Sequence, residues 1–324
     1  MTAPDTPTAA ADAATVNPDA DYTCAVVAPL LYLTVTIEQE GDVPRVHLHP
    51  GGQGFWIARM IEVLGVDARL VAPVGGEAGE VVAALVPTWK IDLMAVRTSA
   101  ESATQVHDRR SGARDEIVGL QIPQLDRHAS DDLFAAVLQA ALTTDALVLT
   151  SGGDGLLRDE AYGRLVHDVR TMGKPIFADL HGSALDALLK GGPIDVLKVS
   201  EEDLAEDGWQ MGTEQQAADA ARELAGRGAA IVVVSRGGEP AVASVDDRLI
   251  RVKPPTLTAV DHHGAGDSMT AGMAVGCLLG LSKVDAVRLG AAAGAGNVTR
   301  RGLGSGRIEL IAELAELVTV EELP

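Results

Sequence analysis

The stretch AVDHHGAGDSMTAGMAVGCLL, residues 259–279, places three small residues directly before a lone carboxylate at the predicted start of a helix. Gly264, Ala265 and Gly266 would let the backbone approach a ligand closely, and the first amide N–H groups of the helix would point at an anion. Asp267 has two open interpretations. Its side chain caps the helix, or it is a base held beside an anion that these amides bind.

The residues after Asp267 predict a helix with a buried face and a closely packed face. Met269, Met273 and Cys277 recur at four-residue spacing, so we expect them to face the core. A second stripe of the same helix consists of small residues that suit close packing, namely Ser268, Gly272 and Gly276.

The composition bounds the class of protein. Of the 324 residues 47% are apolar, and 26 basic against 46 acidic residues give a formal charge of −20. A surface of this charge repels nucleic acids and anionic membranes, so we expect neither as a partner. The two cysteines are too few for a disulfide scaffold or a cysteine-based zinc site. No apolar run reaches the roughly 20 residues of a membrane span and no secretory signal is visible, so the expected location is cytoplasmic.

After a tail, the chain alternates short apolar runs with helix-like blocks. Residues 1–20 are predicted to be a disordered tail and residues 21–324 a single α/β domain. The expected buried strands are 23–28, 68–74, 145–151, 174–180, 194–200 and 229–235, with early helices over 54–65 and 77–86. This rhythm is typical of a parallel sheet covered by crossover helices. A hairpin over 241–252 should turn at Asp246-Asp247, and the chain is predicted to be helical from residue 267 onward.

Two segments interrupt this alternation. Residues 32–49 and about 91–119 are rich in β-branched residues with alternating polarity, which predicts a small separate sheet. A small sheet beside a doubly wound domain commonly serves as a lid. Its exposed edges would also suit a homodimer formed through the lid.

A second glycine-rich helix start precedes the helix predicted at 54–65. In HPGGQGFWIARMIEVLG, which begins at His49, Gly51, Gly52 and Gly54 open the helix. Each motif alone is weak, but two such starts that frame an α/β domain with a split lid are far more specific. With GGQGFWIARMIEVLG and DHHGAGDSMTAGMAVGCLLG as its two motifs, the sequence resembles the ribokinase-like, or PfkB, carbohydrate kinases. The resemblance covers nearly all of the chain after residue 22. Its spacing is closest to the branch that contains 1-phosphofructokinase and tagatose-6-phosphate kinase.

The resemblance implies a ribokinase-like three-layer α/β/α Rossmann-type domain with a small β-sheet lid, and an ATP-dependent kinase. Asp267 would accept the proton of an acceptor hydroxyl, and the amides of Gly264, Ala265 and Gly266 would form the anion hole. The motifs implied for the nucleotide lie at Lys198, Ser235, Gly237, Gly238 and Asn297.

The cofactors implied by the resemblance are ATP and Mg²⁺, with K⁺ as a further candidate. Asp203, in the segment Ser200-Glu201-Glu202-Asp203 that replaces the family's Asn-x-x-Glu, would hold Mg²⁺ through water. His262 and His263 replace small hydroxyl residues of the family's cation loop. Because hydroxyls and carbonyls suit K⁺ better than imidazoles do, this replacement argues against a K⁺ site.

The acceptor end departs from the family's pattern. Tyr32 stands where the branch has an Asp that binds sugar hydroxyls, and Trp56 stands where it has Asn. Gln53 and Gln105 replace the Lys and Arg that bind a sugar phosphate, and the two aromatic rings add surface suited to stacking. The expected acceptor site comprises Tyr32, Gly51, Gly52, Gln53, Trp56 and Gln105.

Loss of two cationic contacts predicts a sugar or sugar-like acceptor that carries no phosphate, because each charged hydrogen bond is worth about 1.5–3 kcal/mol. Two alternatives stay open. A phosphosugar could be held by other cations, such as Arg59, Arg109 or Arg110. A degenerate family member could bind a nucleotide or metabolite as a sensor and catalyse little.

Overall fold

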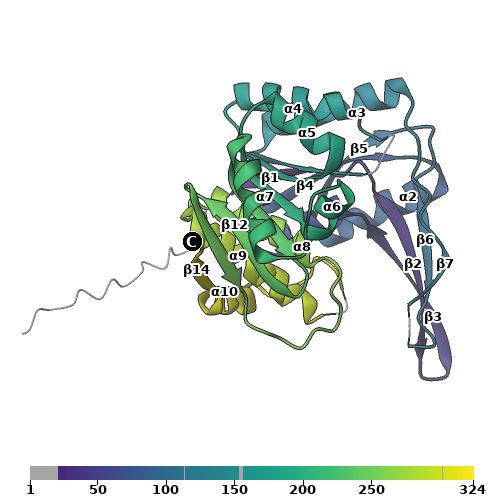
Figure 1. The fold of residues 1–324 in the computed structure, drawn as a ribbon. Helices are drawn as coiled ribbons and strands as arrows, with labels where there is room; N and C mark the ends of the chain where they lie inside the picture. The colour runs from purple at the N-terminus through teal and green to yellow at the C-terminus, as the bar shows by residue number, and fades with distance from the viewer. Residues whose placement is uncertain (1–20, 113, 153–155, 301) are drawn as a thin grey trace, which may run out of the picture.

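A computed structural model describes residues 21–112, 114–152, 156–300 and 302–324, so the predicted tail lies outside the described residues. Its centre is a sheet of ten strands (Figure 1). In spatial order these are β14 (Thr319–Glu322), β13 (Arg248–Lys253), β12 (Glu239–Val245), β11 (Ala229–Arg236), β10 (Ile194–Ser200), β9 (Ile176–Asp179), β8 (Ala146–Thr150), β1 (Thr23–Val27), β4 (Asp67–Val74) and β5 (Asp92–Arg97).

The strands from β11 to β5 are parallel, as the buried apolar runs predict. The chain enters the sheet at β1 and pairs it with β4 on one side and β8 on the other. Strand order therefore reverses beside β1, and in such sheets ligands bind beyond the carboxyl ends of the strands at this point.

Helices cover both faces of the large sheet, which gives the three-layer α/β/α fold (Figure 1). One face carries α1 (Gln53–Val63), α2 (Gly76–Leu85), α8 (Ala265–Leu278), α9 (Lys283–Val298) and α10 (Ile308–Leu317). The other carries α3 (Arg127–Thr143), α4 (Asp159–Thr171), α5 (Gly182–Gly191), α6 (Glu201–Glu206) and α7 (Glu214–Gly226), and a short 3₁₀ helix, η1 (Val86–Trp89), follows α2. Each face has its own apolar core. In the described part of the chain, no helix has both the length and the apolar character of a membrane span.

Helix α8 packs against α9 through its glycine stripe, as its sequence predicts. A Cβ on Gly272 would lie 2.7 Å from the Cα of Gly290, so only glycine lets these backbones approach this closely. Met269 and Met273, on the other stripe, are buried.

The antiparallel end of the sheet was only partly predicted. Asp246 and Asp247 have φ values of 50° and 60° and form the two-residue turn between β12 and β13, which confirms the predicted hairpin. The chain does not stay helical to its end, because Thr319–Glu322 pairs with β13 as β14. Strand addition satisfies backbone groups at the exposed edge of β13, a long-range benefit that local periodicity does not report.

The four-stranded sheet runs β3 (Val43–Gly51), β2 (Tyr32–Glu40), β6 (Thr104–Asp108) and β7 (Asp115–Val118) and projects from the body (Figure 1). One predicted boundary is wrong. Residues 92–97, assigned from sequence to this small sheet, form β5 and pair with β4 in the large one. Strand β5 alternates like an exposed strand because it lies at the edge of the large sheet, where a lid strand and an edge strand have the same pattern.

Candidate active site

The site is built around the start of α8. Gly264 occupies the N-cap with a left-handed φ of 76°, and no side chain caps the helix. The first hydrogen bond of the helix runs from the Ser268 amide to the Gly264 carbonyl, so the preceding amides stay available for an anion. Asp267 lies in this first turn, and its carboxylate makes no capping hydrogen bond. The capping interpretation therefore has no support in this geometry.

A buried polar cluster lies next to this helix start. Lys198 on β10 is 6% exposed, and its Nζ lies 3.3 Å from Oδ1 of Asp179, which ends β9 and is 3% exposed. Thr270 on α8 donates to the other oxygen of Asp179 at 2.7 Å. A Cβ on Gly266 would lie 2.8 Å from Lys198 Nζ. The ammonium group thus lies directly against the backbone of the predicted anion hole.

The charges of this cluster shift each other's protonation equilibria. Burial, reinforced by the Asp179 carboxylate and opposed by Lys198, raises the pKa of Asp267 from 3.8 to about 7. Burial lowers the pKa of Lys198, but the carboxylates of Asp179, Asp267 and Asp203 outweigh it and raise that pKa above its usual value. The site therefore holds a fixed cation beside a carboxylate whose pKa suits a general base near neutral pH.

The second glycine-rich start lies close to the same cluster. Tyr32 packs on Gly51, where any Cβ would collide with the phenol ring. Burial raises the pKa of Tyr32. The charge of Arg114 lowers that pKa, the charge of Asp267 raises it, and a backbone hydrogen bond with Gly52 lowers it. Gln53 opens α1, and its Nε2 donates to the Asp179 carbonyl at 3.4 Å. Four predicted acceptor residues are thus gathered near Asp267.

Gly52→Ala is expected to destabilise the protein by about 3 kcal/mol, since the site has no room for the added Cβ. Gly52 has a φ of 121°, and a Cβ there would collide with the carbonyl oxygen of Leu30. Gly41→Ala is the matched control, because Gly41 also has a positive φ, 62°, but has nothing within 4 Å. Urea unfolding of both variants gives the comparison. Equal losses would mean that backbone conformation, not the collision, limits position 52.

Four of the five residues predicted for the nucleotide, Lys198, Ser235, Gly237 and Gly238, lie at or just beyond the carboxyl ends of β10 and β11. Ser235 is in register with Ser200 at the ends of β11 and β10, and Gly237 and Gly238 form the exposed turn that follows. Asp203 and Ser200 form a capping box at the start of α6. One Asp203 oxygen is used in that box, and its charge still reaches Lys198.

Asn297, the last of the residues implied for the nucleotide, is buried and bonded to backbone groups. It is 1% exposed, its amide donates to the His263 carbonyl at 2.8 Å, and its oxygen accepts from the Ser305 amide at 3.3 Å. The side chain therefore ties the loop before Gly264 to the segment at Ser305. Burial inside α9 decided this, and the polar residue type alone could not reveal it.

Two predicted acceptor residues have other surroundings. Trp56 is 8% exposed and packs edge-on to Phe55 in the core, so it does not present the open stacking face that was predicted. Gln105 on β6 donates to Glu116 of β7 at 3.0 Å. Of the alternative cations, Arg59 stacks on Trp89 and donates to the Leu303 carbonyl at 2.7 Å, so it is largely committed to structure.

Sequence reasoning missed Asp179 and Thr270 as site residues. Asp179 ends a buried apolar strand with a carboxylate, a pattern that signals a ligand-facing strand end in parallel sheets. Thr270 gave no signal, because a threonine inside a helix is common. In the described residues no group of three or more His, Cys, Asp or Glu side chains could enclose a metal ion.

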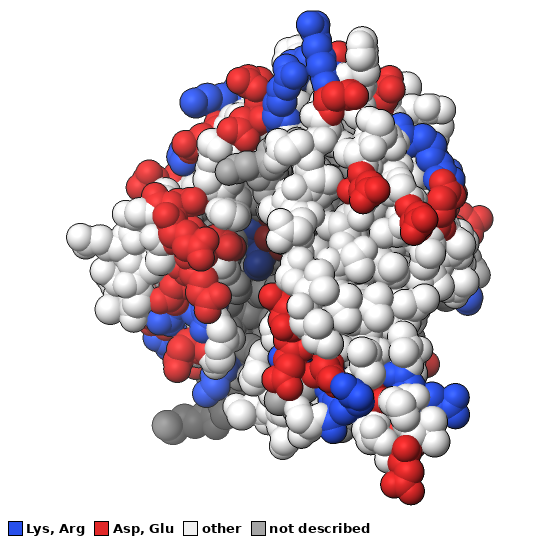
Figure 2. Space-filling model, turned by 90° about the vertical axis from the view of Figure 1, so that its right-hand side faces the viewer, with Lys and Arg blue, Asp and Glu red and all other residues white. Residues whose placement is uncertain are grey.

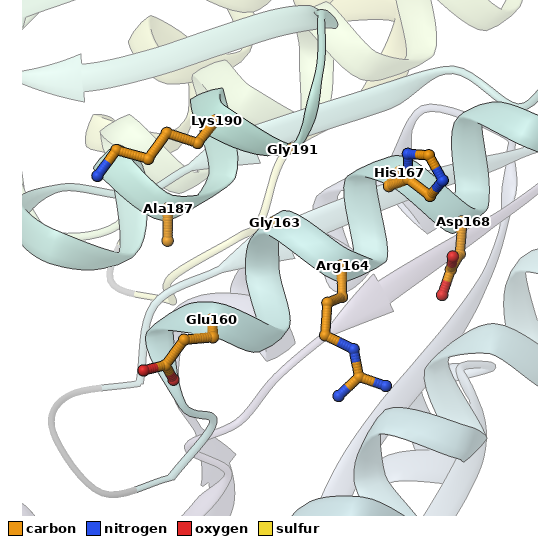
Figure 3. A pocket seen from close by; sticks show the side chains of 8 residues that line it. All are labelled: Glu160, Gly163, Arg164, His167, Asp168, Ala187, Lys190 and Gly191. Carbon is orange, nitrogen blue, oxygen red and sulfur yellow. The ribbon is translucent and has the colours of Figure 1, made fainter.

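The space-filling view shows this face of the molecule hollowed, with charged side chains at the floor of the hollow (Figure 2). A separate surface groove of about 360 Å³ lies between α4 and α5 (Figure 3). Exposed side chains of mixed charge, including Glu160, Arg164 and Lys190, point outward around it. It contains no buried reactive group, unlike the cluster at Asp267.

Comparisons with known proteins agree with this geometry. The model of the pfkB family carbohydrate kinase matches residues 27–309. The chain is 32% identical over 289 residues to an ATP-dependent 6-phosphofructokinase isozyme 2 of Mycobacterium tuberculosis, covering 87% of this chain and 81% of the relative. It is 27% identical to a 1-phosphofructokinase of Vibrio cholerae, covering 91% of this chain and 95% of the relative. The phosphofructokinase-2 of Escherichia coli, in complex with potassium, shares the fold with a TM-score of 0.78 at 23% identity, over 92% of this chain and 98% of that one.

Proposed function

Because this chain belongs to the pfkB family of carbohydrate kinases, whose members are phosphotransferases with an alcohol group as acceptor, we propose that it transfers the γ-phosphoryl group of ATP to a hydroxyl of a sugar-like acceptor. The observation that carries this proposal is Asp267. It is a half-buried carboxylate with a pKa raised to about 7, in the first turn of an uncapped helix and close to the buried Lys198.

The reaction assigns one task to each part of the site. Asp267 accepts the proton of the acceptor hydroxyl as its oxygen bonds to the γ-phosphorus and the bond from that phosphorus to the bridging oxygen of ADP breaks. The amides of Ala265 and Gly266 and the Lys198 ammonium stabilise charge on the transferred group. Asp179, which accepts a hydrogen bond from Thr270, holds that ammonium in place.

The residues present fit ATP with Mg²⁺. Lys198 stays cationic beside free helix amides, which suits phosphates, and Asp203 has a carboxylate oxygen outside its capping bond. Mg²⁺ neutralises phosphate charge when bound, and phosphate oxygens would supply most of its ligands, with Asp203 reaching it through water.

The small sheet contributes Tyr32 to the acceptor wall and brings it within reach of the charge of Asp267. We therefore assign it the role of a lid over the acceptor. The names of the relatives point to sugar phosphates as acceptors, whereas Gln53 and Gln105 favour an uncharged one.

A screen of acceptors with Mg-ATP, followed by ADP release, tests the proposal. The panel contains fructose 1-phosphate, fructose 6-phosphate and tagatose 6-phosphate, their unphosphorylated parents, and nucleosides. We expect magnesium-dependent turnover with at least one member of the panel. If Mg-ATP binds by calorimetry but no acceptor is turned over, the sensor interpretation replaces the kinase.

The outer face of the lid suggests a homodimer. Val46 and Leu48 of β3 and Ile117 and Val118 of β7 are large, apolar and exposed. A face of this kind on a projecting sheet is a common contact between copies. We expect Leu48→Glu to shift a dimer to monomer in sedimentation experiments, while Leu142→Glu, an exposed change on α3, leaves it unchanged. A monomeric wild type would refute the assignment.

A further inference from the structure

Two carboxylates of the site lie around one ammonium group, but the reaction uses only one of them as a base. Oδ1 of Asp179 lies 3.3 Å from Lys198 Nζ. A Cβ on Gly266, the residue before Asp267, would lie 2.8 Å from the same nitrogen. Carboxylates in one buried cluster do not ionise independently, so a neighbouring group has to determine which of them takes a proton near neutral pH.

Thr270 is the side chain that distinguishes the two carboxylates. It lies three residues after Asp267 on α8, hence on the same face of the helix, and it is fully buried. Its hydroxyl oxygen lies 2.7 Å from Oδ2 of Asp179 and 3.2 Å from the carbonyl oxygen of Gly266. A hydroxyl has one proton, and the shorter bond to a charged acceptor is the stronger one, so this proton points at Asp179.

The contact between Thr270 and Asp179 is not the usual local bond of a helix hydroxyl. Serine and threonine inside helices often donate to the carbonyl four residues before them, and Ser268 does so with Gly264 at 2.8 Å. Thr270 has the same choice with Gly266 but lies closer to the carboxylate. Its hydroxyl therefore joins α8 to the end of β9.

This bond leaves the two carboxylates in different states of satisfaction. Both oxygens of Asp179 accept hydrogen bonds, one from Thr270 and the other from the Lys198 ammonium. Hydrogen bonds of this kind favour the ionised form of a carboxylate. Asp267 makes no capping hydrogen bond, and burial raises its pKa to about 7. Asp267 is therefore the member of the pair that is ready to take a proton.

Two further titratable groups face the cluster from other elements. Asp203 of α6 acts on Lys198 through its charge, and the hydroxyl of Tyr32 on β2 interacts with the charge of Asp267. Asp203 is bonded within the capping box of α6, and Tyr32 is bonded to a backbone group. A substitution of Thr270 leaves both groups in place, so its effect reports on the bond to β9.

We propose that Thr270 is a positioning residue for phosphoryl transfer, whose hydroxyl holds Asp179 ionised against Lys198 and thereby leaves Asp267 as the carboxylate that receives the proton of the acceptor hydroxyl. This inference rests on the proposed kinase function. In the active form both carboxylates are ionised before the acceptor reacts, because one holds the ammonium group and the other takes the proton. Loss of the Thr270 donor weakens this form and lets Asp179 compete for the proton.

The pH dependence of kcat/KM tests the role of Thr270. Thr270→Val keeps the shape of the side chain but removes the donor, so we expect the acidic limb to move up by about half to one pH unit. This shift lowers kcat/KM about three- to tenfold at pH 6 and changes it little at pH 9. Thr270→Ser keeps the donor and should retain the wild-type limb.

Thr144→Val is the matched control. Thr144 is also buried, and its hydroxyl donates to the Ala140 carbonyl at 2.9 Å, but it lies before the amino end of β8, at the edge of the sheet opposite the site. We expect this variant to lose stability without moving the limb. An unmoved limb in Thr270→Val, or an equal movement in Thr270→Ser or Thr144→Val, would overturn the proposal.

Carbon-13 NMR of the aspartate carboxyl groups separates this proposal from the kinase function, because it uses protein without nucleotide and requires no turnover. The spectrum of Asp267→Asn identifies the signal of the candidate base. Between pH 5 and pH 9 we expect a second carboxyl signal to titrate in Thr270→Val that does not titrate in the wild type or in Thr270→Ser. Identical titrations in all three proteins overturn the role of Thr270 even if the enzyme is a kinase. The second titrating signal supports it even if no acceptor is turned over.

Discussion

Asp267→Asn is expected to lower kcat by about 10³-fold, because general-base catalysis contributes roughly 10²- to 10⁴-fold and an amide cannot accept the proton. The backbone amides and Lys198 remain, so the KM for ATP should change little. ADP release in steady state, with ATP binding measured separately by calorimetry, checks both parts. A variant that keeps more than a tenth of wild-type kcat would remove Asp267 from the role of base.

The pH dependence of the same variant gives a second check. The pKa of Asp267 is raised to about 7, so wild-type kcat/KM should fall about tenfold per pH unit below that value as the base becomes protonated. The stability of the fold depends on pH in the opposite direction, because it falls as pH rises. The folded protein binds the extra proton between pH 4 and 7, so this carboxylate reduces stability as pH rises through that window.

Replacing Asp267, whose pKa is higher in the folded than in the unfolded protein, should therefore stabilise the fold at high pH. At pH 8 Asp267→Asn is expected to raise the free energy of unfolding by on the order of 2 kcal/mol, and the gain should shrink toward pH 5. Denaturant unfolding at the two pH values measures it. A loss of stability at pH 8 would show that the attraction between Asp267 and Lys198 outweighs burial and the repulsion by Asp179.

Asp179→Asn is expected to destabilise the protein by about 3–5 kcal/mol, because it leaves the buried Lys198 ammonium without its closest partner. Asp219→Asn is the matched control. Its ion pair with Arg222 is exposed on α7, so we expect a change within about 0.5 kcal/mol. Urea unfolding of both variants distinguishes them, and a similar small effect in each would mean that Lys198 is held by other groups.

Asp179→Asn should also change the catalytic profile. Removing a like charge beside Asp267 lowers the pKa of the base, so the acidic limb of kcat/KM should move to lower pH in any protein that stays folded. An unmoved limb would mean that burial alone sets the protonation of Asp267. Since the limb position is independent of how much protein is folded, it separates electrostatics from stability.

Much of the fold could be predicted from local pattern. The parallel strands, the two glycine-rich helix starts and the Asp246-Asp247 turn depend on residues close together in the chain, whose periodicity and backbone preferences are visible in sequence. The same holds for the position of Asp267 in the first turn of α8. The assignment of β5 to the small sheet was wrong, because an edge strand of the large sheet and a strand of the lid show the same alternation of polar and apolar residues.

The sequence by itself determined the α/β class and the family, and it predicted Asp267 as the candidate base. Only the tertiary structure decided what surrounds that carboxylate. Asp179 and Thr270 are 91 residues apart, and Asp179 and Lys198 are 19 apart, yet all three share one buried cluster. Trp56 and Asn297 are covered, while Nδ1 of the buried His107 has no hydrogen-bond partner among the described residues. Burial and the distance between charges arise when separate strands and helices meet, so no local pattern of residues encodes them.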